Sequence, residues 1–114
     1  MPAKKNPLNL NALQLKTLTL MQELARSPAH AEQLPDGAIR VSQLPYPHGD
    51  HFHVGAAIVM ARDANGLANP AAWVALERKG LIKSEFPAAA VLTPAGLAYD
   101  TGLADKILHR HHHH

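Results

Sequence analysis

The chain has 114 residues, a length that fits a single domain. Hydrophobic residues make up 46% of it and aromatic residues only 4%, so its core must be built from Leu, Ile, Val and Ala. The absence of Cys excludes a disulfide framework and thiolate zinc sites. A net charge of +2 singles out neither a nucleic acid nor a membrane as partner. No apolar run approaches the ~20 residues that cross a bilayer, and no apolar signal core follows Lys4 and Lys5, so a soluble cytoplasmic protein is expected.

Three segments are expected: a flexible N-terminus over 1–8, a folded domain over 9–108 and a His-rich tail over 109–114. The tail ends in four consecutive histidines, His111 to His114, after His109 and Arg110. It is either a partial purification tag or a native ending that can bind metal.

The first half of the domain predicts a helix followed by a short strand. Leu residues recur at helical spacing over 9–26, either Asn9 or Asn11 can cap this helix, and Asn11 with Gln14 resembles a capping box. The connector over 28–37 is expected to hold one helical turn at 29–34. Partial alternation over 38–44 predicts a strand, and the prolines and glycine of 44–50 predict a loop.

The second half predicts helices on both sides of a hairpin. Residues 51–54 either extend as a strand or lead straight into an apolar helix over 55–64. A second helix begins at Asn69-Pro70, runs to about Lys79 and stops at Gly80. Strands are expected at 81–85 and 89–92, followed by a helix over 94–108, in which Gly96 and Gly102 each cost up to ~1 kcal/mol relative to Ala.

Two segments carry a resemblance to a known family. They are Leu76-Glu77-Arg78-Lys79-Gly80-Leu81-Ile82 and Leu92-Thr93-Pro94-Ala95-Gly96-Leu97-Ala98. The first resembles the end of a winged-helix recognition helix, and the second resembles the exit from the wing, as in MarR-like and PadR-like bacterial regulators. The resemblance implies an α+β, mostly α fold: a winged helix-turn-helix with a short antiparallel wing.

DNA binding is the function that this resemblance implies, with a homodimer as the expected state. The residues that would contact DNA are polar or basic and lie in or beside the two helices and the first wing strand: Arg62, Asn69, Arg78, Lys79 and Lys83. The expected recognition helix carries few base-reading side chains, and the wing tip has no Lys or Arg. The alternative function is therefore a protein-interaction module that does not read bases.

A histidine cluster is the most unusual local feature. If 51–54 is a strand, His51 and His53 point to the same side of it, about 7 Å apart. With His48 and Asp50 they form a candidate site for Zn, Ni or Cu, because imidazole suits all three metals. The alternative is a polar loop whose histidines face water, and a metal-responsive regulator would unite the cluster with the expected fold.

No other segment indicates catalysis. There is no nucleophile elbow, phosphate-binding glycine loop or paired-carboxylate pattern, so an enzyme is not expected. Pro45-Tyr46-Pro47 is either a stiff loop or a docking strip for a protein partner.

Overall fold

The computed structural model describes residues 6–45 and 47–109, with only the backbone of Pro47 and His48. The elements follow in the order α1 (Ala12–Ala25), β1 (Ala31–Gln33), β2 (Ile39–Ser42), β3 (Pro47–His48), β4 (His51–Val54), β5 (Ala57–Met60), the 3₁₀ turns η1 (Ala61–Asp63) and η2 (Asn65–Ala68), α2 (Pro70–Arg78), β6 (Ile82–Glu85), β7 (Ala89–Leu92), α3 (Pro94–Ala98) and α4 (Ala104–Ile107). Across the described residues, none of the helices has the length and apolarity that a bilayer crossing requires.

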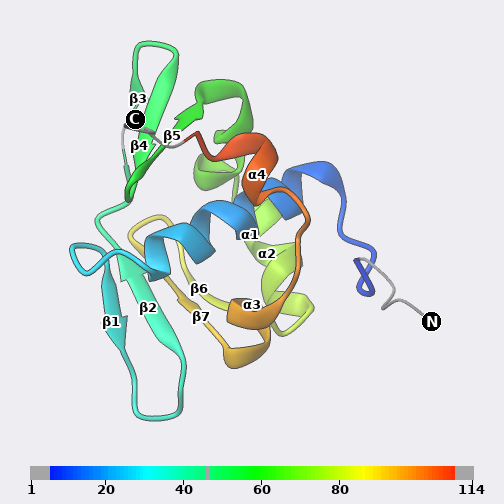
Figure 1. The fold of residues 1–114 in the computed structure, drawn as a ribbon. Helices are drawn as coiled ribbons and strands as arrows, with labels where there is room; N and C mark the ends of the chain where they lie inside the picture. The colour runs from blue at the N-terminus through cyan, green and yellow to red at the C-terminus, as the bar shows by residue number, and fades with distance from the viewer. Residues whose placement is uncertain (1–5, 46, 110–114) are drawn as a thin grey trace.

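Two antiparallel sheets organise the fold (Figure 1). The four-stranded sheet has the order β1-β2-β7-β6, and the three-stranded sheet has the order β3-β4-β5. Leu92 stands opposite both Ile39 of β2 and Ile82 of β6, which places one apolar row across the inner face of the four-stranded sheet. His109 adds a single antiparallel bridge to Ile58 of β5. The last described residue therefore lies against the three-stranded sheet.

Helix α1 begins at the capping box expected from the sequence. The Asn11 side chain accepts a hydrogen bond from the Gln14 amide at 2.9 Å, and Gln14 Oε1 accepts one from the Asn11 amide at 3.0 Å. These bonds satisfy two of the donors that a helix N-terminus leaves without partners. The predicted first helix is thus confirmed, with its observed bounds inside 9–26.

The hydrophobic core lies between α1, α2 and the inner face of the four-stranded sheet. Its largest fully buried side chains come from these elements, from the α2–β6 junction and from strands β4 and β5: Leu18, Leu20, Met21, Leu24, Val41, Val54, Val59, Trp73, Leu76, Leu81, Ile82 and Leu92. Thr17 and Thr19 are buried among them, and their hydroxyls donate to the Leu13 and Leu15 carbonyls at 2.7 Å. Because both hydroxyls have partners, their burial avoids the cost of an unmade hydrogen bond.

The junction from α2 to β6 agrees with the sequence prediction. Asn69 caps α2 by accepting from the Ala71 amide at 2.9 Å, and Pro70 occupies the first turn. Gly80 has a φ of +77°, and the Leu81 amide returns to the Leu76 carbonyl at 3.1 Å. This left-handed cap turns the chain into β6, which pairs with β7. The helix over 70–79 and the hairpin after it are confirmed.

The expected helix over 55–64 is wrong, because these residues form the turn after β4, strand β5 and turn η1. Gly55 turns the chain with a φ of +58°, and Val54, Ala57 and Val59 are buried at alternating positions along β4 and β5. The extended alternative for 51–54 is the observed one. In the described chain, β5 and the 3₁₀ turns η1 and η2 stand directly before α2 where the partner helix of a helix-turn-helix was expected, so the mostly α winged helix-turn-helix class is wrong. The observed class is α+β with substantial antiparallel sheet.

Two smaller expectations also differ from the structure. The single helix expected over 94–108 is interrupted, since α3 ends at Ala98 and α4 starts at Ala104, with Gly102 at a φ of +72° between them. The helical turn expected at 29–34 is replaced by β1, which pairs with β2. The extended backbone at Tyr99 and the positive φ of Gly102 break the first segment, whereas pairing with β2 overrides the weak helical preference of the short second segment.

Candidate functional site

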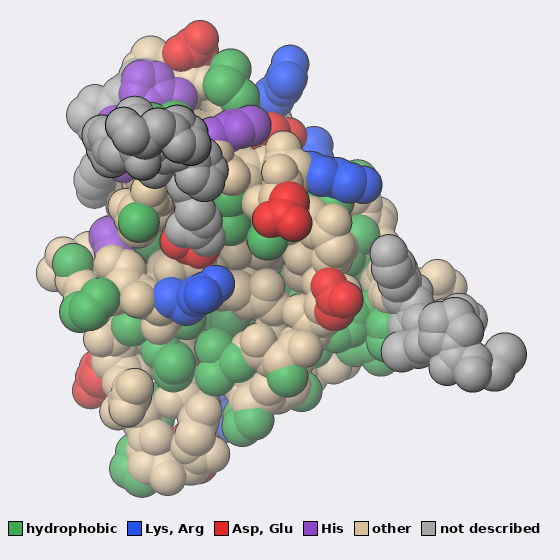
Figure 2. All heavy atoms as spheres, viewed as in Figure 1, with side chains coloured by type: hydrophobic (Ala, Val, Ile, Leu, Met, Phe, Trp, Pro, Cys, Tyr) green, Lys and Arg blue, Asp and Glu red, His purple; other side chains and the backbone are tan. Residues whose placement is uncertain are grey.

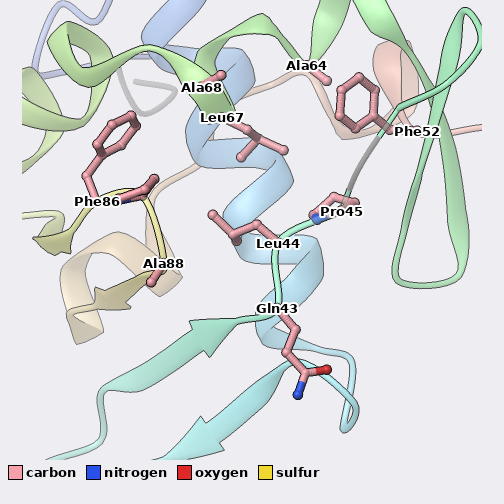
Figure 3. Close-up of a pocket in the computed structure, with 10 residues that line it drawn as sticks. Gln43, Leu44, Pro45, Phe52, Ala64, Leu67, Ala68, Phe86 and Ala88 are labelled. Atoms are coloured by element: carbon pink, nitrogen blue, oxygen red, sulfur yellow. The ribbon is translucent and has the colours of Figure 1, made fainter.

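An apolar groove lies where the two sheets approach each other, and Figure 3 shows the residues around it. Its volume is about 940 Å³. Its lining comes from the loop after β2, from β4, from η2 and its N-terminal flank, and from the β6–β7 turn: Gln43, Leu44, Pro45, Phe52, Ala64, Leu67, Ala68, Phe86, Pro87 and Ala88. We call this feature the groove. In Figure 3, Phe86 and Phe52 stand on opposite sides, with Leu44 and Leu67 between them.

The lining of the groove is chemically simple. Gln43 contributes its one polar side chain, and no titratable side chain is among the described lining residues. Ligand pockets for polar metabolites bring several polar groups together to fix orientation. The groove instead offers apolar surface, which favours a ligand that buries hydrocarbon.

One wall of the groove is anchored in the core through Trp73. The Phe86 ring meets the Trp73 ring edge-on, with centroids 5.0 Å apart and an interplanar angle of 83°. Trp73 is fully buried, and its indole N–H donates to the Gly66 carbonyl at 3.0 Å. Since Leu67 and Ala68 follow Gly66 in η2, the same indole holds both η2 and Phe86 in place. Edge-on aromatic pairs contribute about 0.5–1.5 kcal/mol beyond area burial.

The loop wall contains a strained residue. Gln43 has a φ of +54°, in the left-handed region that residues with a Cβ rarely adopt. Such a conformation costs about 1–3 kcal/mol and persists only where its surroundings impose it. Leu44, the next residue, packs against the core and lines the groove. The strained turn therefore directs Leu44 inward at the groove.

The five residues expected to contact DNA do not form one patch. Arg78 ends α2, Lys79 caps it and Lys83 lies on β6, so these three exposed cations lie near one end of α2. Asn69 is at the other end, about 13 Å away along the helix, and its side chain is engaged as the cap. Arg62 lies in η1, exposed. On the face shown in Figure 2, acidic and basic side chains are interspersed.

The outer face of the four-stranded sheet carries an ion pair that the sequence analysis did not anticipate. Arg40 Nε and Nη2 donate to Glu85 Oε1 at 3.1 and 2.9 Å. This hydrogen bond, reinforced by the charge of Glu85, raises the pKa of Arg40 above its usual value. The pair reaches across β7 and lies beside Lys83. In this part of the surface the carboxylate of Glu85 therefore neutralises the charge of Arg40.

The predicted histidine cluster is brought together in part. His51 and His53 lie on β4 with ring centroids 5.2 Å apart, and Asp50 Oδ1 lies 3.5 Å from His51 Nδ1. The backbone of His48 stands opposite His51 in the register, and its side chain lies outside the described part. In Figure 2 histidine side chains gather at the top, over the three-stranded sheet. Among the described side chains, no group of three or more metal-binding residues is present. The tail residues from Arg110 to His114 also lie outside the described residues.

Among the described lining residues, Pro45 alone belongs to a segment that the sequence marks as a candidate docking strip. The other lining residues come from four separate stretches whose apolar character is ordinary for core. Comparison with protein-family models, with curated proteins and with solved structures finds no match for this chain.

Proposed function

We propose that this protein is a binding module that receives apolar side chains of a partner polypeptide in the groove. The observation that supports this function is a groove of about 940 Å³ whose described lining consists of nine apolar residues and one amide. Large apolar recesses on small proteins mark interaction sites, because monomeric proteins seldom leave such surface exposed. The protein-interaction function was the alternative considered from the sequence, and it does not require the winged-helix fold.

The chemistry of the groove favours a peptide with bulky aliphatic or aromatic anchors. Burying one Leu or Phe side chain contributes about 1.5–3 kcal/mol. Association costs offset part of this gain, so two anchors give weak, readily reversible binding. Among the lining side chains that the structure describes, Gln43 is the one that can hydrogen-bond the peptide backbone.

The test selects displayed random peptides on the full chain and then compares two charge-matched variants. Ala68→Glu places a carboxylate on exposed Ala68 in the groove. Ala95→Glu places the same charge on exposed Ala95, which lies in α3 beyond the opposite end of β7 from the groove. Trp73 is the only Trp in the chain and touches Phe86, so its fluorescence reports occupancy.

We expect selected peptides to share paired apolar residues, to alter Trp73 emission and to lose at least 10-fold in affinity for Ala68→Glu. Placing a charge in an apolar recess without a partner is costly, which is the basis of that loss. The Ala95→Glu variant should bind as the unsubstituted chain does. Selection without enrichment, or equal affinity for Ala68→Glu, overturns the proposal.

The sequence leads us to expect a homodimer. In that case the partner polypeptide is a second copy of this chain, whose apolar side chains fill the groove. Sedimentation equilibrium measures it directly. A dimer that dissociates in Ala68→Glu and persists in Ala95→Glu identifies the second copy as the partner. A dimer that persists in both variants places that contact elsewhere.

DNA binding is a second candidate, supported by the exposure of Arg78, Lys79 and Lys83 near one end of α2. Three phosphate contacts predict that affinity for random duplex falls about 40-fold between ~50 and ~200 mM salt. Arg78→Ala and Lys83→Ala should each weaken binding on all duplexes alike, because phosphate contacts do not read sequence. Fluorescence anisotropy measures both effects, and no binding at the lower salt removes this candidate.

A further inference from the structure

We propose that His51 and His53 form a two-imidazole site for a divalent transition metal, with Asp50 as a positioning residue. This inference concerns the three-stranded sheet and is independent of the function of the groove. Strand β4 is the central strand of that sheet, hydrogen-bonded to β3 on one side and β5 on the other. His51 stands opposite His48 of β3 and Met60 of β5, and His53 stands opposite Ile58 of β5, so strand pairing fixes the backbone under both imidazoles.

The strand geometry places the two rings on one side. Alternate residues of a strand face the same way, so His51 and His53 share a face while Phe52 and Val54 face the other. Val54 is fully buried and Phe52 packs against the core, whereas His53 is exposed and His51 half-buried. The register of β4 is therefore set by its apolar pair, and a one-residue slip would bury the histidines.

The separation of the rings fits chelation. A metal about 2.0–2.1 Å from a ring nitrogen lies about 3.2 Å from the centre of that ring. Two rings with centres 5.2 Å apart then subtend an angle of about 109° at a shared metal, the tetrahedral value. The two ring planes now lie at 78° to each other, and rotation of the His53 ring about its Cβ–Cγ bond changes where its nitrogens point relative to His51. That bond points at the ring centre, so rotation redirects the nitrogens while the centres stay in place, and this torsion is soft for His.

Asp50 is placed to orient the imidazole of His51. Its Oδ1 lies 3.5 Å from Nδ1 of His51, on the side of the ring away from Nε2. Metal-bound histidines commonly donate their second N–H to a carboxylate, which fixes the tautomer and leaves the other nitrogen for the metal. This arrangement directs Nε2 of His51 towards the metal. With two protein ligands, the remaining positions are open to water or to an incoming ligand.

The site should follow the usual divalent order, with Cu²⁺ bound most tightly and Mn²⁺ least. The test is isothermal titration with CuSO₄, NiCl₂ and ZnCl₂ of a full-length background variant in which His111, His112, His113 and His114 are each replaced by Ser. This background removes binding by the consecutive tail histidines. Cu²⁺ electron paramagnetic resonance then counts the coordinated imidazole nitrogens.

We expect one Cu²⁺ per chain with two imidazole nitrogens in its spectrum. In this background, His51→Gln and His53→Gln should each lower Cu²⁺ affinity at least about 10-fold, whereas the control His30→Gln, on the four-stranded-sheet side, should not. Asp50→Asn should lower affinity by less, and Asp50→Glu should restore it. Absence of binding heat, or unchanged affinity and spectrum in His53→Gln, overturns the proposal.

Discussion

Substituting Gly96 by Ala tests how closely α3 packs on the α2–β6 junction. A Cβ at this position would clash with the Leu81 carbonyl oxygen, and would lie 2.9 Å from the Leu81 carbonyl carbon and 3.3 Å from its Cα. The obstacle is backbone that is itself held, because Leu81 is buried and its carbonyl accepts from the Thr93 amide at 3.1 Å. Neither side can yield without moving α3 or the start of β6.

The expected change in the free energy of unfolding has the opposite sign to the change that helix propensity alone gives. Ala is favoured over Gly by up to ~1 kcal/mol within a helix. Inserting a methyl group into a packed interior costs about 1–3 kcal/mol, and more where backbone must shift. Displacing α3 would also lengthen the 2.8 Å hydrogen bonds that Gln22 Nε2 donates to the Gly96 and Tyr99 carbonyls. We expect Gly96→Ala to lower the free energy of unfolding by about 2 kcal/mol net.

Urea denaturation followed by the fluorescence of buried Trp73 measures this change. A loss of this size lowers the midpoint by about 1 M, taking a typical dependence on urea for a small domain. Ala98→Gly, at an exposed position of the same helix, is the control and should cost no more than ~1 kcal/mol. A midpoint for Gly96→Ala at or above that of the unsubstituted chain would refute the packing argument.

Two further substitutions test contacts at the start of the domain. Asn11→Ala removes the side-chain oxygen that accepts from the Gln14 amide, keeps the backbone N–H that donates to Gln14 Oε1, and should cost about 0.5–2 kcal/mol in the same urea assay. Gln14→Ala removes the reciprocal bond and keeps the Asn11 acceptor, so it should cost less; equal losses would contradict the assigned cap. Tyr99→Phe removes the hydroxyl that donates to Asn6 Oδ1 at 2.6 Å and accepts from the Leu8 amide at 3.1 Å. It should cost about 1 kcal/mol and speed hydrogen exchange at Leu8, whereas unchanged exchange there would show that this hydroxyl does not hold the segment.

Local chemistry in the sequence determined the capped helices and the β6–β7 hairpin. The Asn11 capping box, the Asn69-Pro70 start of α2 and the left-handed Gly80 each act within a few residues of chain. Such signals can be recognised in the sequence because the donor, the acceptor and the residue with the required backbone preference are close together along the chain. The pairing of β6 with β7 is equally local, since a short turn joins adjacent strands.

Tertiary structure decided the segment 55–64, and with it the fold class. An apolar, Ala-rich run of this length satisfies both helical and extended periods, so local pattern does not choose between them. In the folded chain, Ala57 and Val59 are buried beside Val54, and β5 is bonded along β4. The preference for strand therefore depends on a partner strand and a core that the segment does not itself supply.

The groove depends on the tertiary structure in the same way. Its walls come from residues near positions 44, 52, 67 and 87, whose separate stretches read as ordinary apolar chain. Apolar burial is non-directional, so a Leu or Phe carries no local sign that it will line a recess instead of filling the core. The His51–Phe52–His53 alternation was visible in the sequence, but the ring separation of 5.2 Å required β4 to be extended and paired with β5. Sequence thus set the local elements, and long-range strand pairing set which surfaces they present.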